Sequence, residues 1–142
     1  MRRHPAFPLL LALLVAGCDG SIHVRGRVYA RAAYDTLPPS LALVDRTGID
    51  TARLRPLSGA IVTLFQRVAD TSAARTDTLL WVRRDTSGAD GSFDIYDVGP
   101  PSGYTAALRV ERVGYRAVTV PFGHRSTEEI HRAVVVLTPV PR

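Results

Sequence analysis

Apolar and polar residues alternate with a period of two along most of this chain. In the segment 22–30, every second position from 22 to 28 is apolar or glycine, with polar residues between; these positions are Ile22, Val24, Gly26 and Val28. Successive side chains of a β-strand point to opposite faces, so this spacing indicates a strand with one buried face. The pattern favours short strands over helices.

Six further segments show the same alternation, with turn-forming residues between them. They are 59–66, 78–83, a strand around Phe93 and Ile95, 104–110, 115–120 and 130–138. We expect Val62, Phe93 and Tyr104 to point inward. Asp90-Gly91 predicts a tight turn that closes a hairpin, because glycine adopts positive φ without steric cost. Seven short antiparallel strands with regularly spaced turns predict an all-β sandwich.

The segment 31–57 does not fit a simple connection between strands, because it is long for a compact domain. It contains Pro38-Pro39 and the apolar patch Leu41-Ala-Leu-Val44. We expect this patch to form a short extra strand or to hold the segment against the core.

The N-terminus begins with two arginines, followed by an apolar run over residues 9–16 that is too short for a permanent membrane span. Its end, Val15-Ala-Gly-Cys18, resembles the lipobox of bacterial lipoproteins. The resemblance implies cleavage after Gly17 and lipidation of Cys18. The alternative is an ordinary signal peptide with an accidental cysteine, but Cys18 is the only cysteine in the chain. We therefore predict a signal peptide over 1–17, a lipidated tether over 18–21 and one domain over 22–139.

Composition narrows the classes of function. The 142 residues carry 46% hydrophobic residues and a formal net charge of +5, with arginine as the only long basic residue. This hydrophobic content argues against global disorder. The arginines are scattered rather than clustered, which argues against nucleic-acid binding.

Candidate catalytic and metal motifs are weak. The sequence lacks G-x-S-x-G, H-E-x-x-H and phosphate-loop patterns. His23 falls on the polar face of the first strand and is interpreted as a solvated residue. The aspartates near the central turn do not match a calcium loop and are interpreted as turn and edge residues; they are Asp85, Asp90, Asp94 and Asp97. We predict no metal site, no cofactor and no enzymatic activity.

Several short motifs together resemble the carboxypeptidase regulatory-like domain. They are Val24-Arg-Gly-Arg-Val28, Leu57-Ser-Gly-Ala-Ile-Val-Thr-Leu64, Asp90-Gly-Ser-Phe93, Gly103-Tyr104, Gly114-Tyr115 and Val134-Val-Val-Leu-Thr-Pro139. The resemblance implies a seven-stranded, transthyretin-like (prealbumin-like) Greek-key sandwich of the kind found in accessory modules. Transthyretin-like hydroxyisourate hydrolases form a remote alternative. Their family ends in Tyr-Arg-Gly-Ser, whereas this chain ends in Thr-Pro-Val-Pro-Arg142.

These inferences predict a lipid-anchored, non-enzymatic module of the bacterial cell envelope that binds envelope proteins or glycans. The alternative is a structural accessory subunit of a transporter or secretion complex. An up-and-down arrangement would place the anchor and the loops 67–77, 97–103 and 122–129 at one end of the sandwich. The partner would then contact the opposite, far end, and the proposed binding residues are Tyr34, Arg46, Arg53 and Arg55.

Overall fold

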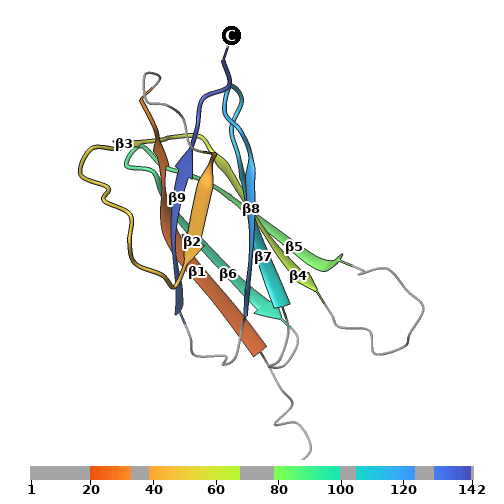
Figure 1. Ribbon diagram of the computed structural model, residues 1–142. Coiled ribbons are helices and arrows are strands. Elements are labelled where there is room, and N and C mark those ends of the chain that lie inside the picture. The colour runs from red at the N-terminus through yellow and green to blue at the C-terminus, as the bar shows by residue number, and fades with distance from the viewer. Residues whose placement is uncertain (1–19, 33–38, 68–78, 100–104, 124–129, 142) are drawn as a thin grey trace, which may run out of the picture.

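A computed structural model describes residues 20–32, 39–67, 79–99, 105–123 and 130–141. Within these ranges the chain forms nine strands and no helix, and the strands form two layers (Figure 1). The predicted all-β sandwich is therefore confirmed as an all-β fold with two sheets. No helix long and apolar enough to cross a membrane occurs in the described part of the chain.

The first sheet is built around the long strand β1. Its strands are β1 (Gly20–Ala30), β2 (Leu41–Val44), β3 (Arg55–Pro56), β6 (Ser92–Gly99) and β9 (Ile130–Leu137). β9 lies between β1 and β2, and β1 pairs on its other side with β6 and then with β3. The second sheet has the order β5-β4-β7-β8, with β4 (Ile61–Arg67), β5 (Leu79–Thr86), β7 (Thr105–Glu111) and β8 (Val118–Gly123).

The prediction of seven antiparallel strands is wrong in two respects. The segment 31–57 contributes two extra strands, β2 and β3, which raises the number to nine in the described part. In addition, β1 and β9 run parallel, with Val24 opposite His131 and Ala30 opposite Leu137. Alternation of apolar residues has the same period in parallel and antiparallel strands, so the sequence pattern could not distinguish them.

The core lies between the two sheets and uses the expected inward residues. Val62 and Phe93 are buried, as predicted, while Tyr104 lies outside the described residues. Ala42 and Val44 of β2 join the same buried cluster, which confirms that the apolar patch forms an extra strand held against the core. The alternation places Tyr29 on the opposite, polar face of β1 from Val28, but Tyr29 is only 9% exposed.

The turn around Asp90-Gly91 connects the two sheets rather than closing a hairpin within one sheet. β5 belongs to the second sheet and β6 to the first, so this short connection crosses between the layers. Gly91 has a φ of 75°, as the turn prediction requires, and its carbonyl accepts a hydrogen bond from the Val28 N–H at 2.8 Å. The connection is also fixed by the buried hydroxyl of Ser87, which donates to the Leu57 carbonyl at 2.7 Å.

Strand β8 begins and ends three residues later than the predicted strand 115–120. It continues through Pro121, which cannot donate a backbone hydrogen bond. This is tolerated because β8 is the edge strand of its sheet and pairs only with β7 in the described part.

The strand ends separate the sandwich into a near end and a far end. β1, β5, β7 and β9 begin at the near end, where β4, β6 and β8 end (Figure 1). The far end contains the end of β1, the strand β3 and the turn 112–115. β1 begins at Gly20, only two residues after Cys18 in the sequence. The strand ends that were predicted to lie on the side of Cys18 are therefore the ones that the registers place beside the start of β1.

Candidate functional site

A cavity of about 660 Å³ lies at the far end of the sandwich. Three arginines and several apolar residues line it, and we call it the arginine cavity: Ala30, Arg31, Ala32, Arg53, Arg55, Val113, Gly114, Tyr115, Pro139 and Val140. Its volume falls within the range of small-molecule sites, about 300–1,000 Å³. Two of the predicted binding residues, Arg53 and Arg55, therefore line one cavity.

Backbone hydrogen bonds hold one wall of the cavity. Arg31 directly follows β1, and its N–H donates to the Leu137 carbonyl at 3.1 Å. Arg55 lies in β3, opposite Ala30 of β1. The turn before β3 closes with a bond from the Leu54 N–H to the Thr51 carbonyl at 3.1 Å, which presents Arg53 to the same cavity.

The opposite wall consists of the turn before β8 and the segment after β9. Tyr115 forms an isolated bridge with Pro139, and the Val140 N–H donates to the Gly114 carbonyl at 2.9 Å. Tyr115 is half-buried and packs against the hydrophobic core. The two walls therefore come from segments fixed to β1 and to β9, which are neighbours in the first sheet.

The arginines of the cavity have no acidic partner in the described part of the chain. Four other arginines there form ion pairs with carboxylates: Arg25, Arg27, Arg83 and Arg109. No such pair involves Arg31, Arg53 or Arg55. The Nε of Arg31 is in addition buried without a hydrogen-bond partner among these residues. The cavity therefore combines three positive charges with an apolar rim.

The other two predicted binding residues do not join this site. Arg46 lines a separate groove of about 630 Å³ between β2 and β8, together with Asp45 and Phe122. Tyr34 lies outside the described residues. Sequence reasoning missed Arg31, although its position directly after a predicted strand at the far end was a usable signal.

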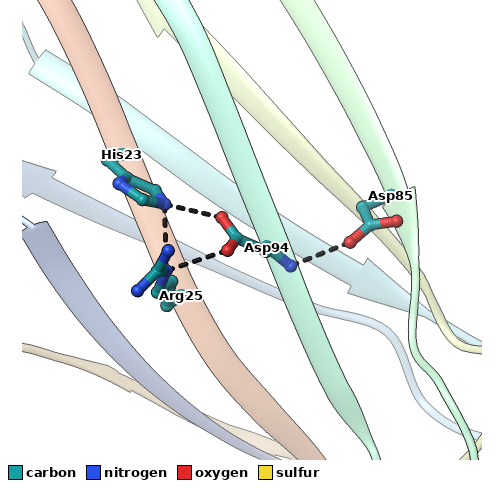
Figure 2. A network of polar contacts seen from close by, with 4 residues as sticks. All are labelled: His23, Arg25, Asp85 and Asp94. Atoms are coloured by element: carbon teal, nitrogen blue, oxygen red, sulfur yellow. Dashed lines mark hydrogen bonds and ion pairs between the residues drawn. The ribbon is translucent and has the colours of Figure 1, made fainter.

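A second polar cluster lies on the outer face of β1 and β6 (Figure 2). Nε2 of His23 lies 2.6 Å from Oδ1 of Asp94, and Nε of Arg25 donates to Oδ2 of Asp94 at 2.8 Å. An ionised carboxylate only accepts hydrogen bonds, so the His23 Nε2–H donates to Asp94, and Nε2 cannot then accept a hydrogen bond from Arg25 Nε, which lies 3.1 Å away. Arg25 and Asp94 are directly opposite in the register, so the cluster is a set of cross-strand pairs.

Asp85, Asp90 and Asp94 behave as the predicted turn and edge residues, whereas Asp97 is buried within β6 and its Oδ1 accepts a hydrogen bond from Arg83 Nε at 2.9 Å. Burial raises the pKa of Asp94. The hydrogen bonds from His23 and Arg25 and their positive charges together lower it by more than burial raises it, so the pKa lies below the ordinary value. Hydrogen bonds from Ser92 likewise lower the pKa of Asp90 in the turn. The Asp85 carboxylate accepts a hydrogen bond from the Asp94 backbone N–H at 2.8 Å. This bond satisfies a backbone donor on the side of β6 that faces away from β1.

A buried histidine was missed by sequence reasoning. His131 of β9 is fully buried, and its Nδ1 lies 2.6 Å from Oδ2 of Asp45, just after β2. Its ring packs edge-on against Phe122, with centroids 4.8 Å apart. Oδ1 of Asp45 accepts the Arg132 N–H at 2.8 Å, so this carboxylate fastens the end of β2 to β9. Among the described residues, no three His, Cys, Asp or Glu side chains gather in a way that could hold a metal ion.

Comparisons with known proteins show likeness of fold alone. No protein-family model matches the sequence, and no similar curated protein is found. Among solved structures, 3-chlorocatechol 1,2-dioxygenase from Rhodococcus opacus 1CP matches 84% of this chain with a TM-score of 0.50 and 10% identity. This chain spans 60% of the length of that dioxygenase.

Two further structures match with lower TM-scores. The dioxygenase domain of a dioxygenase–carbohydrate-binding protein fusion from Streptomyces sp. SirexAA-E has a TM-score of 0.47 and 16% identity, over 89% of this chain and 83% of that one. The plantain pollen allergen Pla l 1 has a TM-score of 0.48 and 16% identity, over 85% of this chain and 98% of that one.

The first of these structures overturns the prediction that the chain is not an enzyme. That prediction took sandwiches of this type to be accessory modules, which are usually not catalytic. The dioxygenase is an enzyme whose chain shares this architecture at a TM-score of 0.50. The fold therefore gives no ground for excluding catalysis, and a shared fold does not assign a function either.

Proposed function

We propose that this protein is a lipid-anchored binding module of the bacterial cell envelope, which engages an envelope protein or glycan through the arginine cavity. One observation carries the proposal. The cavity, whose arginines have no acidic partner among the described residues, lies at the far end of the sandwich, whereas β1 begins at the near end, two residues after Cys18. A membrane anchor at Cys18 would leave the cavity directed away from the lipid.

The lipobox resemblance supports the anchor. Cleavage after Gly17 would make Cys18 the first residue, and two extended residues reach about 7 Å at most. The domain would then stand directly on the membrane surface, on either the periplasmic or the outer-membrane side. Two or three acyl chains provide stable anchoring, whereas one chain binds only marginally.

The motif resemblance supports a finer classification of the fold. As part of the proposal, the domain 22–139 belongs with the transthyretin-like Greek-key sandwiches of the carboxypeptidase regulatory-like type. The buried positions of Val24, Val62 and Phe93 within the matching motifs are compatible with this classification.

A second candidate is a structural subunit of a transporter or secretion complex. It is favoured by the edge strand β5, where Val82 is 47% exposed, because a free edge can accept a partner strand. Extraction in mild detergent separates the two candidates. Stoichiometric recovery with one large membrane protein, unchanged by substitutions in the cavity, would favour the structural subunit.

Two variants test the main proposal. Cys18→Ser should move the protein from the membrane to the soluble fraction, and an unchanged membrane pool would refute the anchor. Crosslinking in whole cells should lose its product in the Arg53→Gln/Arg55→Gln variant. The Arg84→Gln/Arg132→Gln variant is the control, because it removes the same charge at exposed positions outside the cavity. Equal crosslinking in both variants would refute the far-end contact.

A further inference from the structure

We infer that the arginine cavity binds an organic oxyanion, that is, a carboxylate or phosphate group attached to a body with an apolar face. The inference rests on the proposed function, because it names the ligand chemistry of the same site. It is carried by the charge of the cavity, by one buried donor and by the apolar rim.

The charge of the cavity calls for an anion. Arg31, Arg53 and Arg55 line one space of about 660 Å³, and no ion pair with a described carboxylate neutralises them. The positive charges of these arginines repel one another, and a bound anion would reduce this electrostatic repulsion. Guanidinium groups also match the geometry of carboxylate and phosphate, to which they donate paired hydrogen bonds.

The buried donor points to an oxygen ligand. Nε of Arg31 has almost no contact with solvent and no acceptor in the described part of the chain. Buried donors are nearly always paired, because an unpaired donor loses its hydration without compensation. An oxyanion bound side-on to a guanidinium accepts from Nε and from one Nη. Because Nε has almost no solvent contact, the Arg31 side chain would turn toward the cavity on binding, and this donor would then be satisfied.

The rim indicates an organic ligand rather than an inorganic ion. Val113 is 96% exposed and Val140 is 48% exposed, and both border the cavity with Pro139 and the half-buried ring of Tyr115. A small ion would leave this apolar wall in water. A ligand with an apolar face would cover it and gain the corresponding hydrophobic free energy.

The experiment compares small probes by calorimetric titration of the full lipidated chain in detergent at constant ionic strength. Benzoate and phenyl phosphate should bind saturably. Acetate should bind about tenfold more weakly because it lacks the apolar body, and uncharged benzyl alcohol should not bind measurably. Benzyl alcohol binding as well as benzoate would overturn the inference, as would the absence of binding by every anion.

Matched variants separate the site from the general charge of the protein. Arg31→Gln/Arg53→Gln/Arg55→Gln should weaken benzoate binding at least about tenfold. Arg46→Gln/Arg84→Gln/Arg132→Gln removes the same charge outside the cavity and should change it less than about twofold. Equal losses would overturn the inference. Should the first variant fold poorly by circular dichroism, the exposed single substitution Arg53→Gln is compared with Arg84→Gln, which removes one charge at an exposed position outside the cavity.

Two natural sources of the anion are then compared. Glucuronate represents an acidic sugar and N-acetyl-leucine represents the carboxyl end of a peptide, and tighter binding of either one identifies its source. Anion binding with unchanged crosslinking in the Arg53→Gln/Arg55→Gln variant would leave the inference standing and refute the proposed function. Loss of the crosslink in that variant, without binding of any anion to the wild type, would support the proposed function and overturn the inference.

Discussion

At the residue scale, Gly91 lies in the connection between the two sheets, at a position where a Cβ atom would collide with the backbone. Its φ is 75°, and an added Cβ would lie 2.3 Å from the Val28 carbonyl oxygen. Gly114 also has a positive φ, of 84°, but nothing lies within 4 Å of its Cβ position. The two positions therefore separate the cost of the backbone conformation from the cost of a collision.

We predict that Gly91→Ala lowers the free energy of unfolding by at least about 3 kcal/mol, since the strained φ and the contact with a fixed carbonyl act together. Gly114→Ala should cost only about 1 kcal/mol, from the conformation alone. Urea denaturation of both variants measures the difference. Equal costs would show that the contact with Val28 is relieved easily.

Asp94 provides the pH dependence at residue scale. Its pKa is lower in the folded protein, so its ion pairs stabilise the fold above the pKa of the unfolded chain, about 4. The contribution is lost as the pH falls below 4 through the folded pKa. Because the Asp94 side chain is 50% exposed, solvent screening limits the contribution of its ion pairs to stability to about 0.2–1 kcal/mol.

Asp94→Asn should therefore lower the urea midpoint slightly at pH 7, and its difference from the wild type should shrink progressively as the pH falls below 4. Asp50→Asn is the control, since Asp50 forms no ion pair in the described part and accepts only the Ala52 N–H. A difference between Asp94→Asn and the wild type that does not decrease as the pH is lowered from 7 to below 4 would contradict the prediction.

At element scale, the attachment of β2 depends on Asp45. This carboxylate binds the buried Nδ1 of His131 and the Arg132 N–H, while its own backbone has a φ of 54°. Asp45→Ala should reduce the free energy of unfolding by about 2 kcal/mol or more, because the buried imidazole N–H loses its acceptor. Denaturation in urea measures this cost.

Asp45→Gly separates the two causes, since glycine removes the carboxylate but accepts the positive φ without strain. A variant as stable as the wild type would show that the hydrogen bonds contribute little. Asp50→Ala, which removes one exposed turn bond, should cost less than about 1 kcal/mol.

The elements also show which predictions the sequence could support. Strands β1, β4, β6, β7 and β9 were predicted because each buries alternate residues against the other sheet. β3 was missed, since two residues are too few to show a period. The limits of β8 were misplaced, because whether proline ends a strand depends on whether the strand lies at an edge.

At the scale of the whole molecule, the two ends should differ in their distance from the membrane. Cys18 is the only cysteine, and lipidation would block its thiol, so one new thiol can be introduced at either end. Ser58 is exposed at the far end, and Gly123 is exposed at the near end with open space at its Cβ position.

In proteoliposomes, Ser58→Cys should react several-fold faster with a bulky maleimide than Gly123→Cys, because the membrane surface shields the near end. In the Cys18→Ser background without lipid the two rates should agree more closely. Equal rates on the membrane would contradict the proposed orientation.

The sequence by itself determined the all-β character, the main inward residues and the resemblance of Cys18 to a lipidation site, because each depends on residues close together in the chain. Only the tertiary structure decided the parallel pairing of β1 with β9 and the meeting of Arg31 with Arg53 and Arg55. The alternation of apolar and polar residues is the same in parallel and antiparallel strands, so it does not show the direction of a strand. Side chains more than 20 positions apart in the sequence come together only when particular strands pair. The arginine cavity is therefore a product of register, which local sequence does not encode.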